Sequence, residues 1–202
     1  MNELVIATTN AGKFEEIKSF LLLKQPHFKI FPLSEFRNLP EVTEDGSTFI
    51  ENAQKKATLI STFTKKPTLA DDSGLEVAIL GGRPGVLSAR FAGPKATDEQ
   101  NIQKLLEKLK GIPKNDRKAR FRCAMVLREP NGHYQTAVGE VEGFITEEPR
   151  GTSGFGYDPI FEVTDTGRTL AEMSLMEKNR ISHRALALEK ISEQLPNFLQ
   201  KI

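Results

Sequence analysis

The stretch that decides the fold is residues 3–13, which read ELVIATTNAGK. Residues 3–8 form a short, β-branched apolar run, which is typical of a buried strand. After a polar turn, the periodicity changes to that of an amphipathic helix, with one apolar face formed by Phe14, Ile17 and Leu21. A second apolar run near 28–31 indicates a returning strand. The chain is therefore expected to start with a β-α-β unit.

Two further helices are predicted where a threonine precedes a glutamate or glutamine by three residues, the spacing of a capping box. The pairs are Thr48 with Glu51 and Thr97 with Gln100. Residues 34–46, before the first pair, are expected to be irregular and acidic. The run 68–70 predicts a strand that ends in a turn at Asp71-Asp72-Ser73-Gly74. Four glycines and two prolines in 81–94 indicate an ordered loop.

In the second half of the chain, residues 120–128 alternate apolar side chains with arginines, as a half-exposed strand does. Asn131-Gly132 is a hairpin signal, so 133–145 is interpreted as the second strand. A final helix is predicted with Ser182 as its N-cap and an inner face of Ala185, Leu188, Ile191 and Leu195. The expected fold class is α/β, in one domain over residues 1–202 without repeats or a free linker.

Composition excludes several classes of protein. The chain has 202 residues and a formal net charge of only +1, which argues against a basic nucleic-acid binder. The single cysteine, Cys123, rules out an intramolecular disulfide and a thiolate-rich metal site, and its apolar surroundings predict a buried thiol. No stretch resembles a signal peptide or approaches the roughly 18 apolar residues of a membrane span. We therefore expect a cytoplasmic enzyme with no membrane partner.

The first candidate site follows the first predicted strand. A helix N-terminus offers unpaired N–H groups and partial positive charge, which favour an anion. The surrounding side chains would extend this cradle to a polyphosphate, and the residues concerned are Thr8, Thr9, Asn10, Ala11, Gly12 and Lys13. The alternative is a turn whose asparagine merely caps the helix.

The second candidate is the carboxylate pair Asp71-Asp72 with Ser73. Mg²⁺ prefers hard oxygen ligands, usually one or two carboxylates completed by phosphate and water. Side chains of adjacent strand residues point to opposite faces, so one of the two aspartates should face the site. The acidic loop 41–46 would complete the metal site. The alternatives are a simple turn at the strand end and a solvated acidic loop.

Two further segments supply groups for a nucleobase. In 154–159, glycines flank Phe155, which we interpret as a ring that stacks on a base. In the predicted loop 177–184, Lys178, His183 and Arg184 would donate hydrogen bonds to ring oxygens or phosphate. The alternatives are that Phe155 and Tyr157 belong to the core and that the basic loop is ordinary surface.

Several ordered stretches together resemble one family, the non-standard purine nucleoside triphosphate pyrophosphatases (inosine triphosphatase, XTP/dITP diphosphatase). The stretches run from about residue 4 to the final helix. They are Ala7-Thr8-Thr9-Asn10 with Lys13, Thr48-Phe49 with Glu51-Asn52-Ala53, Ala70 to Leu75, Gly81 to Gly93, Phe155 to Pro159, and Ser182-His183-Arg184.

The resemblance implies a long mixed β-sheet with flanking helices, forming two lobes around a central nucleotide cleft, and a homodimer. By the match, Thr8 to Lys13 bind the triphosphate, and Asp72 is the Mg²⁺ ligand and proton acceptor with Ser73 beside it. Phe155, Gly156, Tyr157 and Asp158 hold the base, Lys178 supports base or phosphate, and His183 with Arg184 reads the 6-oxo edge.

One departure concerns the second metal ligand. Many relatives carry two carboxylates before the position of Asp45, whereas here the first of these is Thr43. Glu44 or Glu41 would serve instead, and Glu44 is favoured.

The expected function is Mg²⁺-dependent hydrolysis of non-standard purine nucleoside triphosphates such as ITP, dITP and XTP to monophosphate and pyrophosphate. Two other classes remain open: a regulatory module that binds a purine triphosphate without cleaving it, and an RNA-binding domain that stacks bases on Phe155 and Tyr157. The near-neutral net charge argues against the RNA-binding reading.

Overall fold

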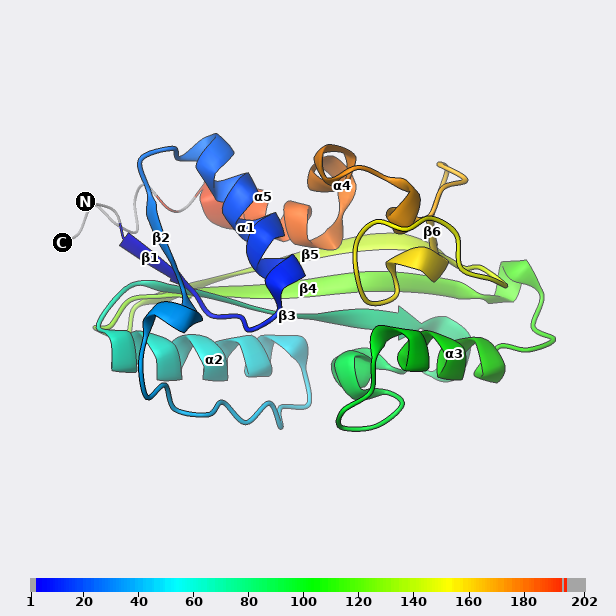
Figure 1. The fold of residues 1–202 in the computed structure, drawn as a ribbon, viewed down its shortest axis with the longest axis horizontal. Coiled ribbons are helices and arrows are strands. Elements are labelled where there is room, and N and C mark those ends of the chain that lie inside the picture. Colours follow the sequence, from blue (N-terminus) through cyan, green and yellow to red (C-terminus); the bar gives the residue numbers. More distant parts are fainter. Residues whose placement is uncertain (1–2, 194, 196–202) are drawn as a thin grey trace. The chain divides into compact units, whose positions relative to one another are not determined.

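The computed structural model describes residues 3–193 and 195, and these form a mixed α/β fold around a curled sheet (Figure 1). The strand order is β2-β1-β3-β4-β5-β6; β1 is parallel to β2 and β3, and β5 is antiparallel to β6. The elements are β1 (Glu3–Ile6), α1 (Ala11–Lys24), β2 (Lys29–Pro32), α2 (Phe49–Thr64), β3 (Thr68–Val77), α3 (Asp98–Lys108), β4 (Lys118–Arg128), β5 (Tyr134–Ile145), β6 (Phe161–Val163), α4 (Leu175–Ile181) and α5 (His183–Ser192). The predicted fold class and the β-α-β start are confirmed.

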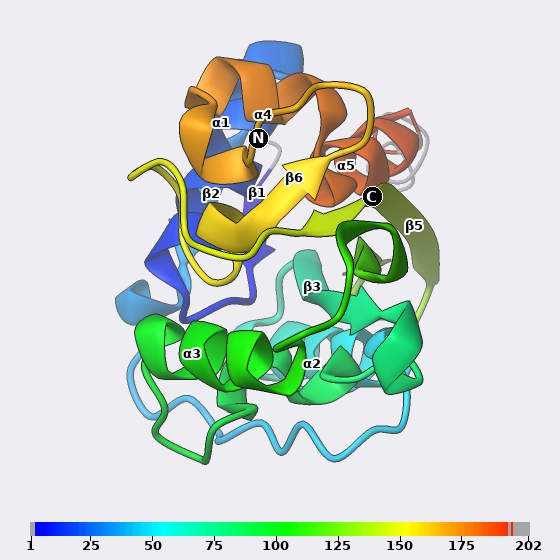
Figure 2. The same cartoon turned by 90° about the vertical axis from the view of Figure 1, so that its right-hand side faces the viewer.

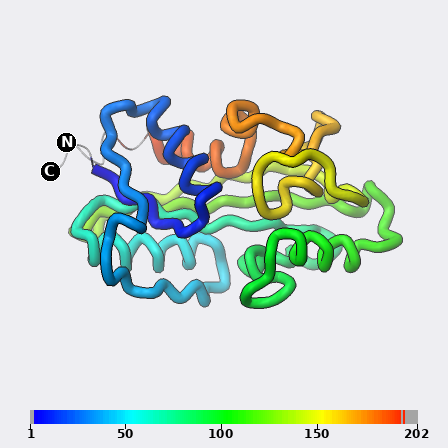
Figure 3. Tube along the Cα trace, viewed as in Figure 1, coloured from blue at the N-terminus to red at the C-terminus, as the bar shows by residue number. Residues whose placement is uncertain are grey.

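The chain divides into two compact units. Unit 1 takes the described residues up to Asp72, those from Cys123 to Gly139, and those from His183 onward; unit 2 takes Ser73–Arg122 and Glu140–Ser182. The chain therefore passes from one unit to the other within β3, β4 and β5 and between α4 and α5, as the trace in Figure 3 allows the reader to follow.

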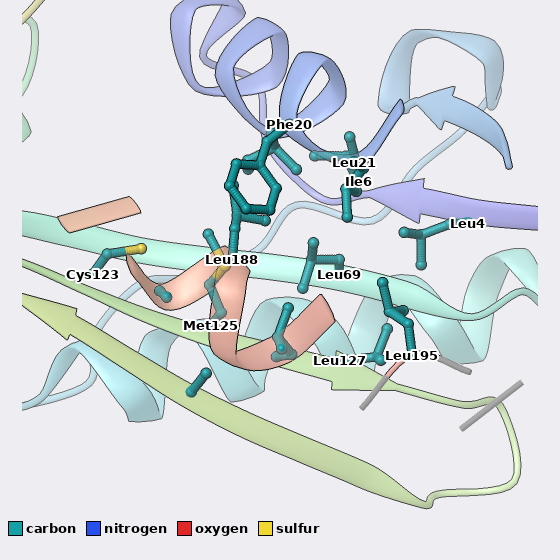
Figure 4. Close-up of a cluster of buried hydrophobic side chains, with 14 of the residues drawn as sticks. Leu4, Ile6, Phe20, Leu21, Leu69, Cys123, Met125, Leu127, Leu188 and Leu195 are labelled. Atoms are coloured by element: carbon teal, nitrogen blue, oxygen red, sulfur yellow. The ribbon is translucent and has the colours of Figure 1, made fainter. Parts of the chain in front are cut away.

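In unit 1 the sheet is covered on both faces, by α1 and α5 on one side and by α2 on the other (Figure 1). Alternate strand residues supply the two cores, as a pleated strand requires. Leu4, Ile6 and Leu69 pack with α1 and α5 (Figure 4), whereas Val5 and Ala70 pack with α2. The predicted inner face of the last helix is confirmed for Ala185, Leu188 and Ile191, which are buried on α5; Leu195 is also buried but follows the end of α5 at Ser192.

Strand β4 differs from the half-exposed strand that its sequence predicts. Residues 119–122 do alternate between buried and half-buried. Residues 123–127, however, are all buried, because Met125 and its neighbours Cys123 and Leu127 face α1 and α5 while Val126 faces α2. Helices on both faces of unit 1 therefore remove the exposed side of this strand, and Cys123 is buried as predicted.

Strand β3 also differs from its prediction. The sequence indicated a strand of three residues and then a turn at 71–74, but β3 continues to Val77. The carboxylates of Asp71 and Asp72 are bound by side chains from other elements, so the segment does not need a turn to satisfy them. Both aspartates consequently lie within a buried strand.

In unit 2, α3 and α4 lie on opposite sides of the strands (Figures 1 and 2). Leu105 on α3 belongs to a core that also contains Leu75, Phe121 and Phe161. The segment 177–181, predicted as a basic loop, forms most of α4 instead. A reciprocal capping box between Ser174 and Glu177 explains this helix, and that pair was overlooked in the sequence.

Candidate functional site

The N-terminus of α1 is built as the sequence indicated. Asn10 is the N-cap, and its side-chain oxygen accepts a hydrogen bond from the backbone N–H of Lys13 at 2.9 Å. The hydroxyl of Thr8 accepts one from the backbone N–H of Asn10 at 3.2 Å. Thr9, Asn10 and Ala11 are exposed, while Thr8, Gly12 and Lys13 are half-buried. The turn thus caps the helix, as the alternative interpretation held, and still presents its polar residues at a helix N-terminus.

Asp71 lies on the face of β3 that α1 and α5 cover. Its Oδ2 is 3.0 Å from Lys13 Nζ and 3.6 Å from Arg184 Nε. Arg184, buried at the start of α5, also forms an ion pair through Nη1 with the buried Glu16 of α1. Two carboxylates and two cations therefore alternate beneath the N-terminus of α1.

The charges around Asp71 keep it ionised. Burial by itself would raise the pKa of this carboxyl, but the positive charges of Lys13, Arg184 and Lys56 outweigh burial and hold its pKa well below the usual range. Burial lowers the pKa of Arg184, but the carboxylates of Glu16 and Asp71 outweigh burial and raise this pKa. The ionised form of Asp71 is consequently favoured, and this carboxylate is less suited than an ordinary one to accept a proton.

Asp72 lies on the opposite face of β3, toward α2. Asn52 Nδ2 donates a hydrogen bond to Asp72 Oδ2 at 2.9 Å, and Lys56 Nζ is 3.8 Å from Asp72 Oδ1. The same Lys56 ammonium is 2.7 Å from Oε1 of Glu44, in the acidic loop before α2. Asp72 and Glu44 therefore share one cation, and Lys56 remains charged because Asp71, Asp72 and Glu44 raise its pKa against the effect of burial.

The pKa of Asp72 is shifted in the direction opposite to that of Asp71. Burial raises the pKa of Asp72 above the ordinary aspartate value, and the nearby cations and the Asn52 hydrogen bond only partly offset this. A carboxyl whose affinity for a proton is increased is better suited to act as a base. Adjacent groups whose environments separate their pKa values are typical of sites where acid–base roles are divided.

The donor set around Lys56 fits a hard divalent cation. Glu44 and Asp72 provide carboxylate oxygens around one position of positive charge, and two carboxylates are the usual protein contribution to a Mg²⁺ site that phosphate and water complete. Among residues 3–193 and 195, no group of three His, Cys, Asp or Glu side chains would hold a metal by itself. Glu41 is exposed, and the contact with Lys56 supports Glu44 as the better candidate.

Unit 2 holds the candidate base-binding residues. Lys178 Nζ donates to Asp158 Oδ2 at 2.8 Å and lies 5.3 Å from the centre of the Phe155 ring. The same Asp158 oxygen accepts the backbone N–H of Phe155 at 3.0 Å. Asp158 and Lys178 are buried, whereas Phe155 is half-buried. One ion pair thus fixes both the backbone and the ring face of Phe155.

The residues beside Phe155 have different surroundings. Tyr157 is buried in the core of unit 2, and its hydroxyl donates to the backbone oxygen of Ser88 at 2.9 Å, so for Tyr157 the interpretation as a core residue is confirmed. The backbone N–H of Gly156 donates to Asp98 at 2.6 Å. Phe155 and Gly156 line a hollow of about 630 Å³ between α3 and the loop before β6. Phe155 therefore borders open space, as a stacking ring must.

The predicted residues fall into two groups, one in each unit. Thr8 to Lys13, Glu44, Asp72, His183 and Arg184 belong to unit 1, whereas Ser73, Phe155 to Asp158 and Lys178 belong to unit 2. His183 is buried at the start of α5, and Ser73 is half-buried in β3. That both groups line one cleft stays a prediction.

Three residues with direct contacts to these groups were not predicted as site residues: Glu16, Asn52 and Lys56. All three are polar residues on buried helix faces, spaced regularly with apolar neighbours such as Ala53 and Ala57. A buried charge or amide requires a partner, so a polar residue at an inward helical position is a signal that could have identified them.

The fold and these two groups define a class of protein: a mixed α/β protein in which the polar N-terminus of a helix lies beside two adjacent strand carboxylates. The chain belongs to the Ham1 family, whose sequence profile matches residues 4–194.

Individual relatives agree with this assignment. The dITP/XTP pyrophosphatases of Bacillus licheniformis and Bacillus subtilis are 52% and 50% identical to it over 195 residues, covering 96% of this chain and 98% of each relative. The solved structure of a HAM1 protein from Coxiella burnetii matches with a TM-score of 0.87 at 45% identity, covering 98% of this chain and 100% of the other. The Staphylococcus aureus Ham1 structure matches with a TM-score of 0.86 at 40% identity and the same coverage.

Proposed function

We propose that this chain hydrolyses non-standard purine nucleoside triphosphates, such as dITP, ITP and XTP, to the monophosphate and pyrophosphate with Mg²⁺. The observation that supports this most is the pair of adjacent β3 carboxylates with opposite pKa shifts, Asp71 paired with Lys13 and Asp72 facing Glu44 and Lys56. Relatives about half identical over nearly their full length bear the name dITP/XTP pyrophosphatase.

The triphosphate binds at the N-terminus of α1. Backbone N–H groups and the helix dipole attract the phosphates, and the side chains from Thr8 to Lys13 extend the contact. Asp71 keeps the Lys13 ammonium close to this helix end. Fixed dipoles and charges of this kind stabilise the charge that develops during phosphoryl transfer.

Glu44 and Asp72 would hold the magnesium ion together with phosphate oxygens and water. Bound there, Mg²⁺ supplies charge neutralisation at the phosphates and polarises water. Asn52 and Lys56 keep the two carboxylates in place from the α2 side.

Asp72 accepts the proton of the attacking water. The water oxygen forms a bond to phosphorus, the bridging P–O bond between the α- and β-phosphates breaks, and pyrophosphate leaves with the bond electrons. Asp72 is favoured for this role over Asp71, because Lys13 and Arg184 lie against the carboxylate of Asp71 on the other face of β3.

Residues of unit 2 and α5 recognise the base. Phe155 stacks on the purine with Gly156 and Tyr157 beside it, Asp158 with Lys178 supports the ring, and Ser73 contacts the substrate near Asp72. His183 and Arg184 read the 6-oxo group. A 6-amino group would leave a buried donor unpaired, which costs on the order of 1–3 kcal/mol, or roughly 5- to 150-fold in selectivity.

A pyrophosphate-release panel tests this function. The purified protein is assayed with ITP, dITP, XTP, ATP and GTP, each with and without Mg²⁺. Release from the first three substrates that requires Mg²⁺ supports the proposal. Tight ITP binding without release would favour the regulatory module instead, and salt-sensitive oligonucleotide binding would favour the RNA-binding domain.

The assembly and location follow from the same family resemblance. We propose that the whole chain acts as one functional domain, that it forms a homodimer, and that it works in the cytoplasm without nucleic-acid or membrane partners. No helix among the described residues has the length and apolar character to cross a membrane. Light scattering coupled to size exclusion measures the assembly, and a monomer at micromolar concentration would contradict it.

A further inference from the structure

The side chain of Asn52 connects the two carboxylates of the proposed metal site. Asn52 is fully buried at the start of α2. Its Nδ2 donates to Asp72 Oδ2 at 2.9 Å, and its Oδ1 accepts the backbone N–H of Gly46 at 2.7 Å. Gly46 follows Glu44 by two residues, so one amide group joins the strand that carries Asp72 to the loop that carries Glu44.

The packing around Gly46 shows how closely this connection is fitted. A Cβ atom added to Gly46 would lie 2.6 Å from Asn52 Oδ1 and 2.9 Å from the Cβ of Glu51. Both distances are shorter than van der Waals contact allows. The loop backbone therefore approaches α2 as closely as it does only because residue 46 has no side chain.

An amide is suited to this position. Ionised Asp72 accepts hydrogen bonds only and the backbone N–H of Gly46 only donates, so the connecting group must donate on one side and accept on the other. This assigns Nδ2 to Asp72 and Oδ1 to Gly46. Aspartate at position 52 would lack the donor, and alanine would lack both functions.

We propose that Asn52 is a positioning residue that holds Asp72 and the Glu44 loop in the arrangement in which both carboxylates bind one divalent cation. This role rests on the proposed function. Loss of a group that orients a metal ligand through a hydrogen bond generally lowers metal affinity about 10- to 100-fold, and we expect an effect of that size for Asn52.

The chain provides a matched control in Asn101. Asn101 is also buried near the start of its helix, α3, and its Oδ1 also accepts a backbone N–H from the preceding loop, that of Ala92 at 2.8 Å. Its Nδ2, however, donates to the backbone oxygen of Ala89 at 3.3 Å and to no carboxylate that is part of the proposed metal site. Loss of Asn101 removes the same kind of loop anchor without touching Asp72.

The experiment measures Mn²⁺ binding to the full chain by electron paramagnetic resonance, for wild type, Asn52→Ala and Asn101→Ala. Mn²⁺ alone is the probe, so the readout does not depend on turnover. We expect the Mn²⁺ dissociation constant to rise about 10- to 100-fold in Asn52→Ala and to stay within about twofold in Asn101→Ala. An equal change in both variants, or none in Asn52→Ala, would overturn the positioning role.

A second variant covers the case in which Asn52→Ala does not fold. Gly46→Ala keeps the amide but pushes the loop away from it, and it should also weaken Mn²⁺ binding, while near-wild-type Mn²⁺ affinity in this variant would overturn the proposal. Wild-type protein that binds no Mn²⁺ would overturn the proposed metal site together with the role of Asn52. If the wild type binds Mn²⁺ and the variants bind it equally well, only the role of Asn52 would be overturned.

Discussion

The N-termini of α2 and α3, one in each unit, are built from the same parts. Each begins with a threonine N-cap, Thr48 or Thr97, and each has a buried asparagine at the fourth helical position, Asn52 or Asn101. Both asparagines use Oδ1 to bind a backbone N–H of the preceding loop. They differ in the partner of the NH₂ group, which is the carboxylate of Asp72 in α2 and a backbone oxygen in α3.

A change of one hydrogen-bond partner is therefore enough to connect such a loop anchor to the proposed metal site. On α3, the Asn101 side chain hydrogen-bonds to backbone groups and fixes the loop before the helix. On α2, the Asn52 side chain fixes the preceding loop and also hydrogen-bonds to the carboxylate of Asp72, whose pKa is raised by burial. The local sequences at the starts of the two helices are similar, so the difference between the two asparagines arises because β3 places Asp72 opposite Asn52.

The largest loss of activity is expected when Asp72 is replaced. Asp72→Asn keeps the shape of the residue but removes the carboxylate that we propose as base and metal ligand, so pyrophosphate release from ITP should fall by roughly 10²- to 10⁴-fold. The far-UV circular dichroism spectrum should be unchanged. Activity near that of wild type would refute the role assigned to Asp72.

A smaller effect is expected from loss of the two anchors themselves. Asn52→Ala and Asn101→Ala each remove the acceptor of a part-buried loop N–H, and the loss of such a hydrogen bond costs about 0.5–1.5 kcal/mol in the free energy of unfolding. Urea denaturation should show losses of similar size in both variants. Pyrophosphate release should fall strongly only in Asn52→Ala, and parallel losses of activity would remove the contrast between the helices.

The two helices also differ at their N-caps. Thr97 and Gln100 form a reciprocal capping box, whereas Thr48 caps its helix and Glu51 accepts the backbone N–H of Ser47, the residue before the N-cap. Thr97→Ala and Thr48→Ala should each lower the free energy of unfolding by about 0.5–2 kcal/mol. Chemical denaturation measures both, and a loss well outside that range in either variant would show that the cap is not the main contribution of the threonine.

The smallest effect concerns Cys123 in the core of unit 1. Burial raises the pKa of this thiol to about 12, so at pH 8 almost none of it is the reactive thiolate. Native protein should therefore fail to react with a disulfide reagent over hours, and reaction should become complete in denaturant. Asn52→Ala should speed labelling modestly by loosening unit 1, and rapid labelling of the native wild type would contradict the buried thiol.

Elements with a strong local signal could be predicted from the sequence. The apolar run before Thr8, the asparagine cap of α1, the capping box at Thr97 and the hairpin around Asn131-Gly132 all formed as expected. Each depends on contacts between residues close in the chain. The inner face of α5 followed from its apolar spacing for the same reason.

The predictions that were wrong concern residues whose structure depends on partners far away in the chain. Asp71-Asp72-Ser73-Gly74 has strong turn propensity, but Lys13 and Asn52 satisfy the carboxylates from other elements, so the strand continues. The exposure of β4 was overestimated because its second face is covered by a helix that precedes it by some sixty residues, α2. The inward helical positions of Asn52 and Lys56 indicate that each needs a polar partner, but only the fold shows that this partner is Asp72.

The ion pair between Lys13 and Asp71 has a consequence for the departure of products. A lysine at a helix N-terminus would on its own hold a polyanion tightly, and pyrophosphate carries several charges. Because Asp71 Oδ2 lies 3.0 Å from the Lys13 ammonium, its negative charge offsets part of that attraction. We expect that this restraint lets the cleaved anion escape, and that the buried aspartate serves repeated turnover as much as it serves binding.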